Sequence, residues 1–151
     1  MSDEQNIYPV PAMDIVALIE AIARGDDSRH QFKADLHNAD SLAAEIVAFS
    51  NSGGGTIVVG ASDQGVVTGL SADDVRRINQ LLANAASQHV RPPVNLFTEN
   101  VAHLSGTVLV VAVPEGMSKP YVDKNGVTWV KNGADKRRVT SREEMQRMRS
   151  P

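Results

Sequence analysis

Apolar residues recur along the chain with two different spacings, which divide it into alternating helices and strands. A spacing of three and four residues is typical of a helix with one buried face, whereas alternation or a short β-branched run is typical of a strand. Helical spacing occupies residues 13–24, 42–51 and 75–88, and a further helix is expected to begin after Ser141. Strand patterns occupy residues 30–36, 56–61, 94–102, 107–113, 121–122 and 127–131. The sequence therefore predicts an α+β fold that combines a mixed β-sheet of about six strands with about four helices.

Residues suited to capping stand at the predicted helix ends. Gly25 follows the first helix, where a left-handed C-terminal cap is expected. Arg91-Pro92-Pro93 closes the third helix, because the residue before a proline disfavours helical geometry. The other helices begin at polar residues that can accept hydrogen bonds from free N–H groups, namely Asp40 or Ser41, Ser71 and Ser141.

Turn residues predict three antiparallel hairpins. Asp63-Gln64-Gly65 is a tight-turn sequence within Gly60 to Gly69, so residues 66–68 are expected to return beside the preceding strand. Ser105-Gly106 joins the strand patterns at 94–102 and 107–113. Asn125-Gly126 is expected to pair Tyr121 and Val122 with residues 127–131.

Three consecutive glycines, residues 53–55, separate the second helix from the following strand. A phosphate-binding glycine loop has the opposite order, strand before helix, because the helix N-terminus supplies the free N–H groups. The sequence therefore does not predict a Walker-type nucleotide site. Two interpretations stay open: the glycines end the helix and let the chain pass close to its neighbour, or they also form a backbone nest for phosphate, flanked by Asn51 and Ser52.

Length and composition are those of one folded domain. The 151 residues are 42% hydrophobic and 22% charged, and we expect residues 13–149 to form the domain after an N-terminal extension, residues 1–12. The absence of cysteine excludes a disulfide scaffold and any cysteine-ligated zinc. With no leader pattern and no apolar run long enough to span a bilayer, the expected location is cytoplasmic.

Charge is distributed unevenly along the chain. The net charge of −3 argues against a surface that is basic throughout, yet the segment from Lys131 to Arg149 is locally basic. We expect Lys131, Lys136, Arg137 and Arg138 to bracket a phosphate track around residues 132–134, because Lys and Arg neutralise phosphates without reading sequence. Lys33, Lys119 and Lys124 are expected to extend this track.

Base stacking and histidine chemistry are poorly supported by the composition. Aromatic residues make up only 4% of the chain, and Trp129 is expected in the core. The histidines, His30, His37, His89 and His103, lack the spacing of metal ligands, so no metal site is predicted from them.

Three ordered segments resemble the Schlafen AlbA-like domain, a DNA-binding family of predicted prokaryotic transcriptional regulators. These are AIARGDDSRHQFK at 21–33, AEIVAFSNSGGGTIVVGASDQGVVTG at 44–69 and KPYVDKNGVTWVKNGADKRRVTSREEMQRM at 119–148. The resemblance covers nearly the whole chain and implies an α+β fold, a mixed sheet and nucleic acid as partner. In long relatives the domain precedes other modules, which leaves open that this chain is the N-terminal part of a longer regulator.

The resemblance also implies an enzymatic alternative, since some family members cut RNA through a Glu-Ser-x-x-x-Glu-Phe-Lys stretch and an Asp in the glycine-rich hairpin. Converging carboxylates would hold a divalent metal that activates water. Here the acidic positions fall on Asp26, Gln31 and Asp63, with Lys33 to steady charge. Because the neutral Gln31 stands where the family pattern has a glutamate, an enzyme is the less favoured interpretation. Asp27 and Phe32 stand at the serine and phenylalanine positions of the stretch, and Asp27 or Asp35 would be an additional metal ligand.

The expected function is a nucleic-acid-binding domain without a cofactor, preferring DNA to RNA, as the DNA-binding module of a transcriptional regulator. A homo-oligomer is expected, because one basic patch of this size gives limited affinity. The alternatives are a metal-dependent endoribonuclease, or a nucleotide-phosphate or protein-interaction module. The expected contact residues are Lys33, Asn51, Gly53, Gly54, Lys119, Lys131, Lys136, Arg137, Arg138 and Arg142.

Overall fold

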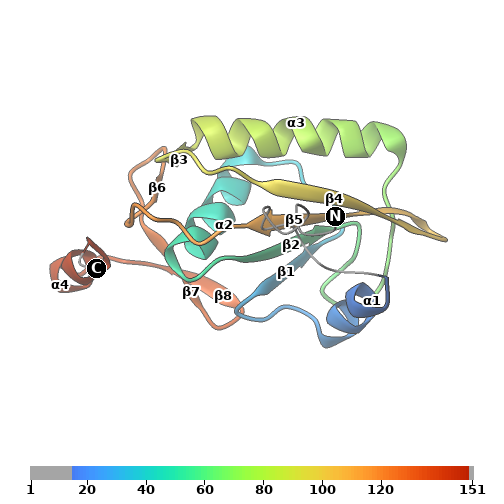
Figure 1. The fold of residues 1–151 in the computed structure, drawn as a ribbon, viewed down its shortest axis with the longest axis horizontal. Coiled ribbons are helices and arrows are strands. Elements are labelled where there is room, and N and C mark those ends of the chain that lie inside the picture. The colour runs from blue at the N-terminus through green and yellow to red at the C-terminus, as the bar shows by residue number, and fades with distance from the viewer. Residues whose placement is uncertain (1–14, 150–151) are drawn as a thin grey trace, which may run out of the picture.

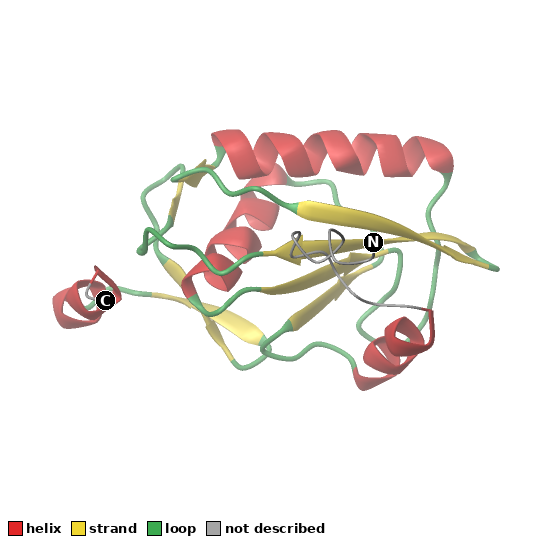
Figure 2. Ribbon diagram, in the orientation of Figure 1, coloured by secondary structure: helices red, strands yellow, loops and turns green. Residues whose placement is uncertain are grey.

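The computed structural model describes residues 15–149 as an arrangement of helices on a central sheet (Figures 1 and 2). Residues 1–12, predicted as an extension, and residues 13–14 of the first predicted helix lie outside the described residues. The helices are α1 Ile15–Arg24, α2 Ala39–Asn51, α3 Ala72–Gln88 and α4 Arg142–Arg149. The strands are β1 His30–Lys33, β2 Gly55–Val59, β3 Val90–Arg91, β4 Phe97–His103, β5 Gly106–Val113, β6 Val122–Asp123, β7 Trp129–Asn132 and β8 Asp135–Arg138.

The central sheet is mixed, as predicted. Its four strands run in the order β1-β2-β5-β4; β1 and β2 are parallel, and the other two pairs are antiparallel. β3 pairs with β6 and β7 with β8 in separate two-stranded sheets. The predicted α+β class and the four helices are confirmed, but within the described residues eight strands in three sheets replace the single sheet of about six.

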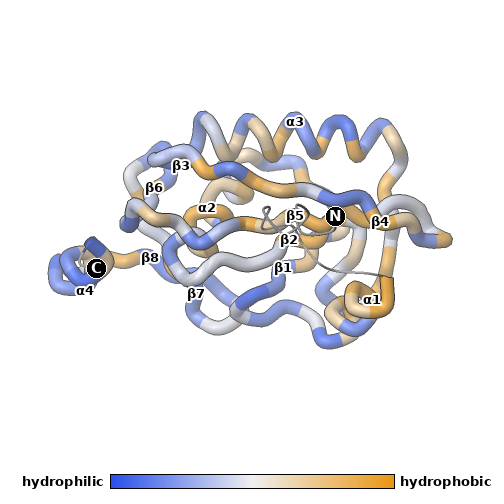
Figure 3. The backbone as a smooth tube through the Cα atoms, in the orientation of Figure 1, coloured by the Kyte–Doolittle hydropathy of each residue, from blue (hydrophilic) through white to orange (hydrophobic). Residues whose placement is uncertain are grey.

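Helices cover both faces of the central sheet. On one face α2 and α3 enclose the larger core cluster, which includes Phe49 from α2 and Ile57 and Val59 from β2. On the other face α1 packs its buried residues against Phe32 and Val58. The alternation along β2 is the period-two pattern of a strand buried on both sides, and the central strands are correspondingly hydrophobic in Figure 3.

Three of the four predicted helix caps are confirmed. Gly25 has the left-handed backbone expected of a C-terminal cap, with φ of 79°. Ser71 Oγ accepts from Asp74 N at 3.1 Å, and Ser141 Oγ accepts from Glu144 N at 3.2 Å. The cap of α2 was predicted wrongly at Asp40 or Ser41: it is Asn38, whose Oδ1 accepts from the N–H groups of both residues at 2.8 and 3.1 Å.

The predicted hairpins form to different extents. The β4–β5 hairpin at Ser105-Gly106 is confirmed. The turn around Asp63-Gln64-Gly65 also forms, but its return is a single bridge between Ala61 and Val67 and not a strand.

The turn predicted at Asn125-Gly126 forms, with Gly126 N donating to Asp123 O at 2.9 Å, but the predicted pairing of Tyr121 and Val122 with residues 127–131 is wrong. Asp123 Oδ1 accepts from the backbone N–H groups of Asn125 and Val127 at 2.9 and 3.0 Å, which closes a compact turn without extending a ladder. β6 pairs with β3 instead, and β7 pairs with β8 across the turn at Gly133, where φ is 62°. None of the helices within residues 15–149 is long and apolar enough to cross a membrane.

Candidate nucleic-acid interface

The β7–β8 hairpin gathers cations on one of its faces. Its register places Lys131 opposite Lys136 and Trp129 opposite Arg138. Directly opposed residues share a face of an antiparallel pair, so these four side chains lie together, and Arg137 lies on the reverse face. Lys136 also lines a small cavity of about 50 Å³ together with Lys33 of β1. We call Lys33, Lys131, Lys136 and Arg138 the basic edge.

Trp129 lies at the centre of this face and not in the core as predicted. It is partly buried against the main core cluster, and its Nε1 donates to Asp123 Oδ2 at 3.0 Å. Lys136 Nζ lies 5.6 Å and Arg138 Cζ 5.5 Å from the ring centroid, within cation–π range. The Trp129 ring therefore orients the side chains of Lys136 and Arg138.

The predicted basic residues differ in how far they are already paired. Lys136 Nζ donates to Glu45 Oε2 at 3.0 Å, and the Arg137 guanidinium binds both carboxylate oxygens of Glu144 at 3.0 and 2.6 Å. Within residues 15–149, neither Lys33 nor Arg138 forms an ion pair. Lys33 and Arg138 are therefore the basic-edge charges most open to an external anion.

A chain of hydrogen bonds joins the basic edge to the loop after α1. Asp26 Oδ1 accepts from Phe32 N at 2.8 Å, and Asp26 Oδ2 accepts from Gln31 Nε2 at 2.8 Å. The other end of the same amide, Gln31 Oε1, accepts from Lys131 Nζ at 3.2 Å. Gln31, which is buried, thus connects an anion of one segment to a cation of another.

Asp26, Asp63 and Lys33 come into one neighbourhood, as the resemblance implied. Burial raises the pKa of Asp26 above its ordinary value, and the negative charge of Asp63 raises it further. The hydrogen bond from Phe32 N and the charges of Lys33 and Lys131 oppose this rise in pKa. Asp63 itself lies in an exposed turn, where its Oδ1 accepts from Gln64 Nε2 at 3.2 Å.

These residues do not fit a divalent metal ion. Both oxygens of Asp26 already accept hydrogen bonds, and the Gln31 carbonyl faces an ammonium group. Nowhere in residues 15–149 do three His, Asp or Glu side chains gather as metal ligands. The donor set lacks the converging carboxylates that hard cations require.

The two acids suggested as helping ligands are also engaged elsewhere. Asp27 Oδ1 accepts from Arg29 N at 2.8 Å and contacts His30 Nδ1 at 3.0 Å. Asp35 Oδ1 accepts from Arg77 at 2.7 Å. Burial raises the pKa of each carboxyl, but these hydrogen bonds outweigh burial and leave both pKa values below the ordinary one.

The glycine loop serves close packing, which is the first of the two predicted interpretations. Gly54 N donates to Phe49 O at 2.7 Å, so this N–H caps α2 and is not free for phosphate. A Cβ on Gly54 would lie 2.8 Å from Val113 O, and one on Gly55 would overlap the Phe49 ring. The carbonyls of Gly53 and Gly54 accept from Arg29 at 2.5 and 3.3 Å, so a guanidinium that the sequence analysis missed covers the loop.

Asn51, predicted as a nucleic-acid contact, makes its side-chain hydrogen bonds within the protein. Its buried Nδ2 donates to Tyr121 O at 3.0 Å and to Trp129 O at 2.8 Å, and its Oδ1 accepts from Tyr121 N at 2.8 Å. These hydrogen bonds fasten the end of α2 to the C-terminal segments. No signal in the sequence could have shown this, because the partners are backbone groups some 70 residues away.

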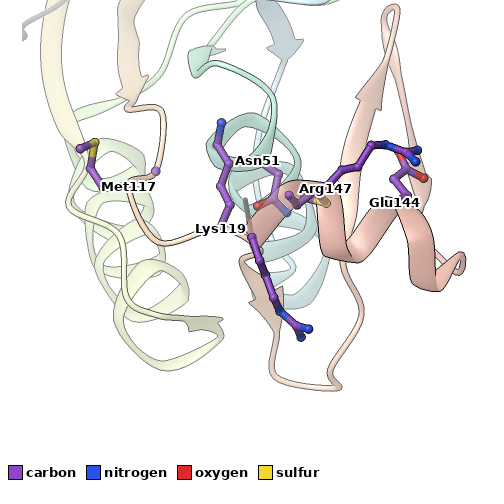
Figure 4. Close-up of a pocket in the computed structure, with 8 residues that line it drawn as sticks. Asn51, Met117, Lys119, Glu144 and Arg147 are labelled. Atoms are coloured by element: carbon purple, nitrogen blue, oxygen red, sulfur yellow. The ribbon is translucent and has the colours of Figure 1, made fainter. Parts of the chain in front are cut away.

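A groove of about 620 Å³ separates the 116–119 loop from α4 (Figure 4). Lys119 lines the groove and pairs with Glu115 at 2.6 Å, and Arg147 points toward Glu144 in Figure 4. Arg142 is exposed in the first turn of α4, and Lys124 pairs with Asp40 at 3.2 Å. Two of the three cations that line the groove, Lys119 and Arg147, therefore face nearby acids, whereas the third, Arg149, forms no ion pair within residues 15–149.

The family model described as Schlafen, AlbA_2 matches residues 26–140. The chain belongs to this family. The matched segment includes the whole Asp26–Gln31–Lys131 connection and the basic edge, so the predicted resemblance is confirmed over the residues that build the site. No curated protein sequence matches the chain.

Two solved structures share the fold of this Schlafen AlbA_2 domain. One is titled "N-terminal Domain of Putative ATP-dependent DNA Helicase RecG-related Protein" from Nitrosomonas europaea, with a TM-score of 0.58 and 23% identity over 85% of this chain and 90% of that one. The other is the DIP2311 protein from Corynebacterium diphtheriae, with a TM-score of 0.57 and 21% identity over 91% of this chain. This chain spans 28% of the length of the Corynebacterium protein.

Proposed function

We propose that this Schlafen AlbA_2 domain binds nucleic acid, with DNA as the preferred partner, and acts as the DNA-binding module of a transcriptional regulator. The observation that carries the proposal is the basic edge, where the β7–β8 hairpin places Lys131, Lys136 and Arg138 around Trp129 beside Lys33. A row of cations held at the edge of a sheet suits the regular spacing of backbone phosphates.

The local chemistry favours contact with the phosphate backbone over base readout. Trp129 already has Lys136 and Arg138 near its ring, which leaves little free aromatic face for a stacked base. Lys131 and Lys136 are fixed by protein contacts, whereas Lys33 and Arg138 are without ion pairs within residues 15–149. Lys131 and Lys136 therefore hold the basic edge in place, and Lys33 and Arg138 are the charges available to bind a phosphate.

Support for DNA as the partner comes from the Nitrosomonas structure, whose title describes a DNA helicase-related protein. The endoribonuclease alternative is disfavoured by the donor set around Asp26. The groove between residues 116–119 and α4 gives a nucleotide-phosphate module less support, because two of its three cations, Lys119 and Arg147, face nearby acids.

Fluorescence anisotropy with labelled duplex DNA, single-stranded DNA and structured RNA tests the proposal. The informative variant is Lys33→Ala with Arg138→Ala, which removes two charges without breaking an ion pair within residues 15–149. Removing two phosphate contacts is expected to weaken binding about tenfold or more and to lower the slope of log affinity against log salt by about 2.

The control is Arg76→Ala with Arg91→Ala, which also removes two charges, one of them from an exposed ion pair with Asp73, on the α3 and β3 side of the molecule away from the hairpin (Figure 1). The control should lose affinity by less than about threefold. Equal losses in both double variants, or tighter binding of RNA than of DNA, would contradict the proposal as stated.

A further inference from the structure

Gln31 joins two opposite charges through the two ends of one amide. Its Nε2 donates to the Asp26 carboxylate at 2.8 Å, and its Oε1 accepts from the Lys131 ammonium at 3.2 Å. An amide can do both because it carries a donor and an acceptor on the same planar group. A glutamate in the same position would place two carboxylates about 2.8 Å apart, which requires a shared proton or an added cation.

Lys131 is held in this position from several directions. Its Nζ also donates to Ala134 O at 3.0 Å and lies 4.7 Å from the centroid of the Phe49 ring. Its backbone N donates to Ser52 Oγ at 2.9 Å. The ammonium is thus fixed by the hairpin turn, by α2 and by β1, and is not a mobile surface charge.

The negative charges of three acids act on the Lys131 ammonium. Burial lowers the pKa of Lys131 below its ordinary value, and the charge of Lys136 lowers it further, whereas the negative charges of Glu45, Asp26 and Asp135 oppose this shift and favour the protonated form. Glu45 is buried, and its Oε1 has no hydrogen-bond partner within residues 15–149. A group of acids partly withdrawn from water needs a positive charge nearby, which a metal ion or an ammonium can supply.

We propose that Lys131 is the resident cation of this acidic site. Its ammonium neutralises Asp26 through Gln31 and fastens the β7–β8 hairpin to β1, and so leaves no place for a divalent metal. Gln31 makes this arrangement possible, because its Oε1 accepts a hydrogen bond from the Lys131 ammonium while its Nε2 donates one to Asp26. As a consequence, which rests on the proposed function, the hairpin binds nucleic acid equally well with and without divalent metal.

Titration with Mn²⁺, followed by electron paramagnetic resonance of the free ion, tests this inference without nucleic acid. The wild type and Gln31→Glu are expected to bind no Mn²⁺ at this site, since the carboxylate introduced by Gln31→Glu pairs with Lys131. The double variant Gln31→Glu with Lys131→Met leaves the carboxylates of Asp26 and of the introduced glutamate without the Lys131 ammonium, and it is expected to bind one Mn²⁺ at least tenfold more tightly than the wild type. Lys124→Met with Gln31→Glu is the matched control and should behave as Gln31→Glu.

Three results would overturn the inference about Lys131. One Mn²⁺ bound by the wild type and lost in Asp26→Asn would overturn the inference, and this measurement holds even if the double variant fails to fold. Binding by Gln31→Glu alone as tight as by the double variant would show that Lys131 does not exclude the metal. A folded double variant that binds no better than the wild type would also overturn the inference. Absence of DNA binding, by contrast, would refute only the proposed function.

Discussion

At the scale of single residues, two buried amides hold together segments that are distant in the sequence. Gln31 links the loop after α1 to the hairpin, and Asn51 links the end of α2 to the backbone at Tyr121 and Trp129. An amide suits both places because each requires a donor and an acceptor from one uncharged side chain. Two uncharged amide side chains therefore help to hold the basic edge in position.

Replacing Asn51 tests this role at the residue scale. Asn51→Asp removes the donor to Tyr121 O and Trp129 O and turns a carboxylate oxygen toward two carbonyls. The free energy of unfolding is expected to fall by about 2–4 kcal/mol, because buried polar groups lose their partners. Chemical denaturation measures this change, with Asn125→Asp in an exposed turn as a control that should change by less than about 0.5 kcal/mol. Equal effects in the two variants would refute the role assigned to Asn51.

Residue-level prediction succeeded where a family match fixed positions and failed where backbone groups were the partners. Asp26, Asp63 and Lys33 were placed together by their resemblance to a known stretch, and the structure brings them together. The roles of Asn51 and Arg29 depend on carbonyl groups that only the folded chain brings near. Side-chain patterns carry no information about such partners.

At the scale of elements, the helices and the central strands follow directly from periodicity. β2 alternates its side chains between two helix-covered faces, and α3 begins at the predicted serine cap. The misassigned hairpin shows the limit of turn motifs. Asn125-Gly126 does form a turn, but the Asp123 side chain satisfies the N–H groups that a ladder would have used, so pairing passes to the next turn.

The C-terminal helix is expected to be the least protected helix. α4 is largely hydrophilic (Figure 3) and has no buried residue among those described, and the bidentate pair between Arg137 and Glu144 links it to β8. Amide hydrogen exchange should therefore be fast throughout α4, while the amides of Ile46 to Phe49 in α2 exchange only on global unfolding. Comparable protection of α4 and α2 would contradict this account.

At the scale of the whole molecule, an acidic chain presents a basic edge. The net charge is −3, yet Lys33, Lys131, Lys136 and Arg138 are concentrated where β1 meets the β7–β8 hairpin. Part of the acidic charge on this side is neutralised internally, by Lys131 and Lys136. The sequence predicted the local excess of cations and Lys33 as their extension, but only the fold shows that Lys33 and Lys136 line one cavity although their strands belong to different sheets.

The most direct test of the account is an NMR titration of the ¹⁵N-labelled domain with a short DNA duplex at low salt. The account predicts chemical-shift changes that gather on β1, β7 and β8, with the largest at Lys33, Arg138 and the Trp129 indole, and little change along α3. Shifts centred on α3 or on the groove between residues 116–119 and α4, or no shifts at all, would contradict the claim that the basic edge is the nucleic-acid interface.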